Sequence, residues 1–259
     1  MATLPREDEA DLRRARAILE NPSWTARLTA YLGKPLEEGF RRLPQGWQEI
    51  VAAAARKALF KGLSFTILTL GDPRPRPARE TLHRLLVTAT GTAGGALGVA
   101  SLPVELPVST CLILRSIADI ARSEGHDLSL PTTRLACLEV LAIGPHRGAD
   151  HPEGGYWITR SVLAKAVSDA AAYLAHRGLA REGAPPLVRL VTAIAPRFGV
   201  TVSQQAAARA VPIVGALGGG TINYLFMRHF QEMARGHFII LRLEKLYGSD
   251  TLREIYETL

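Results

Sequence analysis

Residues 144–156 concentrate side chains that can bind a metal ion or transfer a proton. They include His146, Asp150, His151 and Glu153. Imidazole and carboxylate groups are ligands for zinc and other divalent ions. Their spacing matches no standard metal motif, and a solvated loop in which Asp150 caps the following helix accounts for the same residues. We therefore expect no metal or other cofactor, and the candidate ligands if a metal does bind are Asp150, His151 and Glu153.

A second set of charges stands among apolar residues in the segment 106–119. Arg115 and Asp119 are four residues apart, so a helix brings them to one face. Leu and Ile residues surround Arg115, and a buried guanidinium needs a partner. We predict that Arg115 is buried and paired with Asp119 or Glu105. Glu139 stands in a comparable apolar stretch. Two interpretations remain: an internal ion-pair network that fixes helix register, and a polar floor in an apolar cavity.

The sequence contains no familiar catalytic motif. GxSxG, HExxH, the P-loop and a GxGxxG after a strand are all absent. His229 and His237 share a helical face, but they have no nearby third ligand, so we expect no metal there. One enzymatic hypothesis remains, a metal-dependent or acid-dependent hydrolase. It requires the fold to bring together Glu105, Asp119, Asp150, His151 and Glu153.

Two long uncharged runs must position these groups. Residues 85–104 and residues 210–227 contain no charge. The first run is long enough to cross a bilayer, but its glycines and Pro103 weaken a membrane-spanning helix. Small residues let helices approach closely, both in lipid and in a tightly packed bundle. We predict a lipid-binding surface with a polar floor, formed by Gly94, Gly95, Gly98, Glu105, Arg115, Asp119, Gly218, Gly219 and Asn223.

The apolar periodicity predicts helices almost throughout the chain. Prolines at helix starts and glycines at helix ends predict N-terminal helices over residues 5–20, 23–32, 35–43 and 45–70. A break between helices is expected at residues 197–201. No segment alternates with period two for long. The predicted fold is an all-α multi-helix bundle with two Gly-rich apolar helical hairpins at its core.

Residues 71–77 predict a linker, because three alternating prolines fix an extended backbone. The linker divides the chain into two predicted parts. Residues 1–75 form a basic amphipathic helical subdomain, and residues 76–259 form an apolar helical core.

Composition narrows the location and the partners. The 259 residues are 47% hydrophobic, carry a net charge of +7 and include only two cysteines, Cys111 and Cys137. Both cysteines lie in apolar stretches, which favours small buried hydrophobes in a reducing compartment. The N-terminus resembles no secretory signal, so we expect a cytoplasmic protein. Aromatic residues are only 6% of the chain and do not interleave with a basic run. The positive charge therefore suits an anionic lipid surface, or serves only solubility, and of the possible partners we expect a lipid or membrane surface and no nucleic acid.

Four ordered motifs give the chain a family resemblance. They are LPVELPVSTCLILRSIADIAR, RLACLEVLAIG, DHPEGGYWITRSVLA and AVPIVGALGGGTINYLFMRHFQEMARGHFIILRLEKLYG. Together they make the chain resemble the EcsC family over roughly residues 55–259. The resemblance implies a mostly helical protein on the cytoplasmic side, without a defined reaction. The family is named for a protein encoded beside an ABC transporter, so a membrane transporter is a candidate partner.

The resemblance also matches positions of the family motifs to individual residues of this chain. The LPxELP turn and the helix after it fall on Pro103, Glu105, Pro107, Arg115 and Asp119. The paired-acid loop falls on Asp150, His151 and Glu153, followed by Tyr156 and Arg160. The second aspartate of that loop is His151 here, which argues against a metal bound by the acid pair.

Two functional hypotheses follow. The first is a non-enzymatic accessory protein that binds lipid or associates peripherally with the cytoplasmic face of a membrane, and we favour it. The second is the hydrolase described above. Convergence of its acidic residues around a pocket would favour the enzyme, and an apolar tunnel beneath the glycine-rich runs would favour lipid.

Overall fold

The computed structural model describes residues 4–20, 23–32, 36–69, 78–95, 101–144, 155–177, 183–211 and 215–259. Within these ranges the chain forms eleven α-helices and no strand. The predicted all-α class is confirmed.

The N-terminal helices lie close to their predicted bounds. They are α1 (Arg6–Glu20), α2 (Ser23–Leu32), α3 (Leu36–Arg41) and α4 (Trp47–Thr69). The later helices are α5 (Glu80–Gly95), α6 (Leu102–Ser123), α7 (Pro131–Glu139), α8 (Gly155–Arg177), α9 (Pro185–Arg209), α10 (Gly215–Tyr247) and α11 (Ser249–Thr258), with a short 3-10 helix, η2 (Val140–Ala142), after α7.

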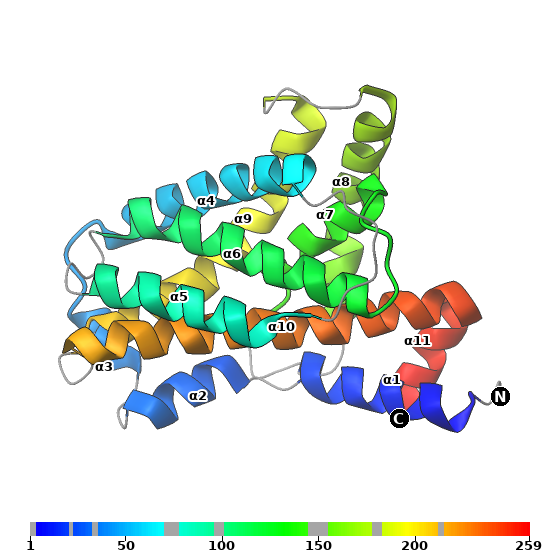
Figure 1. Cartoon of the computed structure of the whole chain (residues 1–259), viewed down its shortest axis with the longest axis horizontal. Helices are drawn as coiled ribbons and strands as arrows, with labels where there is room; N and C mark the ends of the chain where they lie inside the picture. The colour runs from blue at the N-terminus through cyan, green and yellow to red at the C-terminus, as the bar shows by residue number, and fades with distance from the viewer. Residues whose placement is uncertain are drawn as a thin grey trace.

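Four long helices, α4, α6, α5 and α10, lie side by side across the molecule (Figure 1). Helix α9 packs against α4 and α8. Helices α1 and α2 lie along α10, and α11 turns back from the end of α10 onto α1. The two chain termini therefore lie at the same end of the molecule.

The two predicted hairpins correspond to α5 with α6 and to α9 with α10. Helices α5 and α6 run in opposite directions in Figure 1 and contact each other, and α9 contacts α10. The first uncharged run is thus divided between two helices rather than forming one. Within the described ranges, no helix combines the length and the hydropathy that crossing a bilayer requires.

The predicted break at residues 197–201 is wrong, because α9 continues from Pro185 to Arg209 with Pro196 inside it. A proline in a helix interior removes one hydrogen bond and costs roughly 3 kcal/mol. The same turns bury Ile194, Phe198 and Val202. Burying such side chains contributes about 1.5–3 kcal/mol each, so tertiary packing outweighs the local cost.

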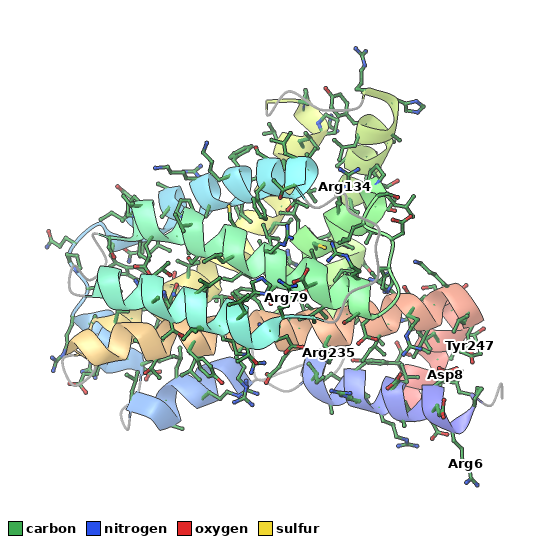
Figure 2. All side chains as sticks on the ribbon, in the orientation of Figure 1. Arg6, Asp8, Arg79, Arg134, Arg235 and Tyr247 are labelled. Carbon is green, nitrogen blue, oxygen red and sulfur yellow. The ribbon has the colours of Figure 1, made fainter. Side chains whose placement is uncertain are left out.

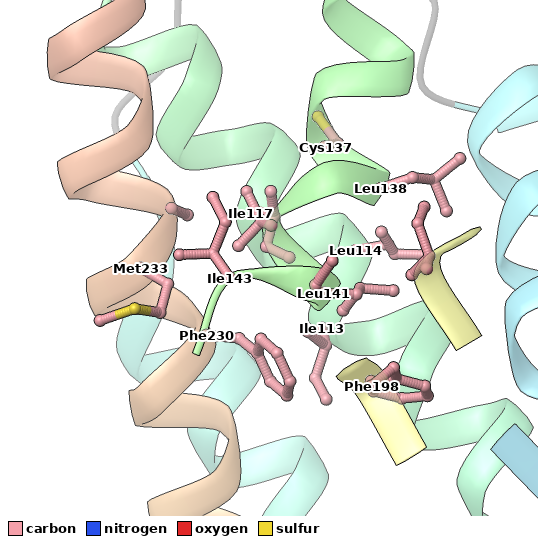
Figure 3. Packing of buried hydrophobic residues seen from close by; sticks show 14 of the residues in the cluster. Ile113, Leu114, Ile117, Cys137, Leu138, Leu141, Ile143, Phe198, Phe230 and Met233 are labelled. Atoms are coloured by element: carbon pink, nitrogen blue, oxygen red, sulfur yellow. The ribbon is translucent and has the colours of Figure 1, made fainter. Parts of the chain in front are cut away.

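A single apolar core joins most of the helices. Figure 3 shows Ile113 and Leu114 of α6 facing Phe198 of α9 and Phe230 of α10. Leu12, Leu28 and Leu59, from helices before the predicted linker, belong to the same buried cluster. Both sides of the predicted division at residue 75 therefore contribute to one core, and the division itself stays a prediction.

Candidate functional site

An open groove of about 660 Å³ runs between α4 and α6. Its apolar lining comes from Phe65, Pro103, Val104, Pro107, Val108, Cys111 and Leu112, and its cationic lining from Lys57, Lys61 and Arg115. No carboxylate belongs to this set of described residues. The groove is therefore an apolar trough whose only charges are positive.

Helical periodicity explains why these residues meet. Lys57, Lys61 and Phe65 recur every four residues along α4, and Val104 and Val108 do the same on α6. The side chain of Val104 is 74% exposed and that of Val108 is 52% exposed. Helix α6 thus presents an apolar stripe that the rest of the described chain leaves uncovered.

Two prolines fix one end of the groove. Pro107 lies inside α6 and has no N–H, so the carbonyl of Pro103 lacks its usual partner four residues later. The Nζ of Lys57 donates a hydrogen bond to that carbonyl oxygen at 3.2 Å. The spacing of the LPxELP motif therefore creates an acceptor that attaches α4 to α6.

The predicted burial and pairing of Arg115 are wrong. Arg115 is only partly buried and lines the groove. It forms no ion pair with Asp119, with Glu105 or with any other described residue. The reason is that α6 turns this position toward α4 and solvent, while Glu105 points toward α9. Whether Arg115 binds a ligand stays a prediction.

Asp119 lies in a separate buried cluster farther along α6. Its Oδ1 accepts a hydrogen bond from Arg122 at 3.0 Å, and its Oδ2 lies 3.9 Å from Nε2 of His83. Burial lowers the pKa of His83, the Asp119 charge opposes this, and the charges of Arg115 and Arg79 lower it further. His83 therefore favours its neutral form beside the Arg122–Asp119 pair.

Glu105 is the centre of a buried polar network that joins α5, α6, α9 and α10. Both of its oxygens accept hydrogen bonds from Arg209, at 2.7 and 2.8 Å. The side chain of Arg209 is 2% exposed and that of Glu105 is 8% exposed. Asn223 donates to Glu105 at 2.8 Å and to the carbonyl of Val87 at 3.2 Å, and Gln205 donates to Asn223 at 2.8 Å.

The charge state of Glu105 follows from these contacts. Burial raises the pKa of Glu105, but the hydrogen bonds and the charge of Arg209, together with hydrogen bonds from Asn223 and Ser101, lower it by more. Glu105 is therefore a carboxylate with its acceptor positions filled. Such a group holds four helices in register and is not poised to transfer a proton.

A second buried network joins α7, α8 and α10. The hydroxyl of Tyr156 lies 3.0 Å from Nδ1 of His237, and Nε2 of His237 lies 3.8 Å from Oε2 of Glu139. Arg160 donates to both oxygens of Glu244, at 2.7 and 3.0 Å. The pKa of Glu139 is raised to about 7, mainly by burial. The positive charge of Arg160 lowers this pKa, and the negative charge of Glu244 raises it. Burial lowers the pKa of His237.

The described residues do not assemble the hydrolase cluster. Glu105 and Asp119 lie fourteen positions apart on α6, about 21 Å at 1.5 Å per residue, and each already has an arginine partner. Asp150, His151 and Glu153 lie outside the described residues. Among the residues that are described, no three His, Cys, Asp or Glu side chains are grouped as metal ligands.

Only some of the glycines that were predicted to form a contact surface lie among the described residues. Gly94 and Gly95 form the end of α5, and Gly218 and Gly219 are buried in the first turns of α10. Gly98 lies outside the described residues. Close contacts occur at two glycines that the sequence analysis did not single out: a Cβ at Gly39 would lie 2.1 Å from the Ala207 carbonyl oxygen, and one at Gly236 would lie 2.8 Å from Leu19.

Sequence reasoning missed several partners of the predicted residues. It assigned no role to Arg209, Gln205 or Arg122. One signal was available: the four-residue spacing of Pro103 and Pro107 implies an unpaired carbonyl that a nearby donor such as Lys57 can satisfy.

Comparison with known proteins supports the motif-based resemblance. The sequence profile described as the EcsC protein family matches residues 73–243, which is more than half of the chain. No curated protein and no solved structure is significantly similar to the chain. The matched region includes α6 of the groove, the Glu105 network and nearly all of α10.

Proposed function

The chain belongs to the EcsC protein family, and from its groove we propose that it is a non-enzymatic protein that associates peripherally with an anionic lipid surface through α4 and α6. The observation that carries this proposal is the open apolar groove with three cations and no carboxylate in its lining. Exposed apolar patches of this kind mark interaction surfaces.

The chemistry of the lining favours lipid as the partner. The stems of Lys57 and Lys61 line the apolar groove while both residues remain largely exposed. Lysine side chains in this arrangement cover apolar surface and keep the ammonium group in water, as they do at membrane interfaces. Each cation close to an anionic leaflet contributes about 1 kcal/mol of binding.

A neighbouring helix exposes further apolar side chains. Helix α5 contacts α6 and exposes Leu82, Leu85 and Leu86, of which Leu85 is 66% exposed. Exposed aliphatic side chains need an apolar partner to become buried. The hydrocarbon boundary of a leaflet provides one, which supports a membrane surface as the binding partner.

Location and partner are further parts of the proposal. Both cysteines are free, which accords with a reducing compartment and hence with the cytoplasmic face of a membrane. A membrane transporter as the protein partner rests only on the family resemblance.

Vesicle flotation tests the proposal directly. We expect the protein to float with vesicles that contain phosphatidylglycerol and to remain unbound with pure phosphatidylcholine vesicles. Val104→Asp should abolish flotation because it places a carboxylate on the apolar stripe. Lys61→Gln should weaken binding about fivefold, the equivalent of roughly 1 kcal/mol.

Matched changes on α8 serve as controls. Val162 is 55% exposed and Lys165 is exposed, so Val162→Asp and Lys165→Gln alter the same side-chain types away from the groove. Both variants should float like the wild type. The proposed surface would be refuted if the α8 variants lost as much binding as the α4 and α6 variants. It would also be refuted if the wild-type protein did not float.

A further inference from the structure

The groove is chemically different at its two ends. At the Val104 end, the ammonium group of Lys57 is engaged by the Pro103 carbonyl at 3.2 Å. At the other end lies Arg115, which has no acidic partner in the part of the chain that the structure describes. Lys57 therefore already donates one of its hydrogen bonds to the backbone, whereas the guanidinium of Arg115 remains available to an anion.

A second unpaired cation lies close to that end. Arg79, labelled in Figure 2, directly precedes α5 and is exposed, and it forms no ion pair within the described ranges. Arg79 and Arg115 both lie near enough to His83 for their charges to lower its pKa. The Nδ1 of His83 is buried and has no hydrogen-bond partner among the described residues. Two carboxylates lie in this neighbourhood, and both already have arginine partners: Asp119 is bound to Arg122, and Glu80 is bound to Arg84 and Arg235.

The length of the trough matches one acyl chain. From Val104 to Arg115 the lining advances eleven positions along α6, about 16.5 Å at 1.5 Å per residue. The hydrocarbon core of a bilayer is about 30 Å thick, so one leaflet, and hence one extended chain, is about 15 Å. The volume of about 660 Å³ is also within the range of ordinary ligand sites, roughly 300–1,000 Å³.

We infer that the groove binds a single phosphate-bearing amphiphile, with its acyl chain over Leu112, Val108 and Val104 and its phosphate between Arg115 and Arg79. This inference rests on the proposed function and gives the lipid class and orientation at the same site. A guanidinium fork pairs with two oxygens of an oxyanion. One fork saturates a carboxylate, whereas two forks match the oxygens of a phosphate.

Cys111 provides a reporter inside the groove. It lines the trough, whereas Cys137 is fully buried. Burial raises the pKa of the Cys111 thiol, and the positive charge of Lys61 partly offsets this rise. Because the thiolate is the reactive form, alkylation by N-ethylmaleimide is best followed near pH 8.5. Intact-protein mass spectrometry counts the adducts, and the variant Cys111→Ser confirms which thiol reacts.

The test uses dodecyl phosphate below its micelle concentration and without vesicles. We expect it to slow alkylation of Cys111 by roughly tenfold or more. Dodecyl maltoside, with the same chain and a neutral head, and inorganic phosphate, with no chain, should each protect far less. The double variant Arg79→Gln/Arg115→Gln should need at least about tenfold more dodecyl phosphate for half protection.

Arg56→Gln is the matched control, because Arg56 is exposed on α4 and does not line the groove. It should leave protection unchanged. If dodecyl phosphate fails to protect Cys111 while the protein still floats with anionic vesicles, the lipid-capture inference fails and the proposed function stands. If dodecyl phosphate protected the double variant at the same concentrations as the wild type, the placement of the phosphate between Arg79 and Arg115 would be overturned. An acidic peptide helix as the true occupant would leave Cys111 unprotected by the amphiphile.

Discussion

At the scale of single residues, burial and pairing separate two arginines that look alike in the sequence. Arg115 and Arg209 both border apolar stretches. Arg209 has a side chain that is 2% exposed and binds both oxygens of Glu105, whereas Arg115 lines an open groove. The cost of losing a charge depends on what its removal leaves behind in the core.

Arg209→Met should therefore be strongly destabilising. It leaves the Glu105 carboxylate buried without its cation, at a cost on the order of 3–5 kcal/mol. Arg115→Met should change the free energy of unfolding by only about 0.5 kcal/mol, the usual size at partly exposed positions without partners. Urea unfolding of the two variants measures the contrast. Similar losses in both would contradict the assigned pairing, and a double substitution with Glu105→Leu should recover part of the Arg209 loss.

Glu139 predicts a pH dependence of stability. Burial raises its pKa in the folded protein from 4.5 to about 7. A raised pKa contributes stability that is fully present below the unfolded value and is lost as the pH rises through the folded value. Glu139→Gln stays neutral, so its stability relative to wild type should rise between pH 4.5 and pH 7, by up to about 3 kcal/mol.

Urea unfolding near pH 5 and near pH 8.5 measures this difference. His237 lies 3.8 Å from Glu139, but burial holds the pKa of His237 well below its ordinary value, so we expect Glu139 to be the group of this pair that titrates between the two pH values. Glu254→Gln, at an exposed position on α11, is the control and should differ from wild type equally little at both pH values. A constant difference for Glu139→Gln would show that this carboxylate does not titrate in the predicted window.

At the scale of helices, close packing depends on which glycine faces which backbone. Gly39 of α3 lies against α9, and a Cβ there would come within 2.1 Å of the Ala207 carbonyl oxygen. Real Cβ atoms do not approach a backbone oxygen so closely, so α3 and α9 must move apart to accept a methyl group. Gly199, in the middle of α9, has nothing within 4 Å of the corresponding position.

Alanine at these two positions should have effects of opposite sign. Gly39→Ala should destabilise by about 1–3 kcal/mol through overpacking. Gly199→Ala should stabilise by about 0.5–1 kcal/mol, because alanine loses less backbone entropy in a helix. Thermal unfolding distinguishes them. A neutral Gly39→Ala would mean that α3 repacks on α9 at little cost.

At the scale of the whole molecule, α10 connects the two predicted parts of the chain. Helix α1 packs along α10, where Leu19 and Ala15 lie against Gly236. Helix α2 contacts α10 as well, and its Arg27 forms an ion pair with Glu232 at 2.6 Å. The core likewise joins α4 to α6. A fragment of residues 76–259 would expose all of these surfaces to water.

We therefore expect residues 76–259 expressed alone to lack a cooperative unfolding transition and a native near-ultraviolet circular dichroism spectrum. The reason is that the fragment cannot bury the faces of α6 and α10 that α4 and α1 cover. The full-length chain is the reference. A fragment that unfolds cooperatively with the melting temperature of the full-length chain would establish the division near residue 75 as a true domain boundary.

The sequence by itself determined the helical class, the approximate bounds of the four N-terminal helices and the family. These depend on local signals: prolines and glycines fix where helices begin and end, and apolar periodicity fixes the buried face. It also marked Arg115 as a charge that needs a partner and named Glu105 and Asp119 as the candidates. Only the tertiary structure decided that Glu105 pairs with Arg209 and Asp119 with Arg122, that Arg115 faces a groove, and that α9 continues past Pro196. Such outcomes depend on contacts between residues far apart in the chain. Local sequence does not predict them, because the periodicity of one helix carries no information about which neighbouring helix covers each of its faces.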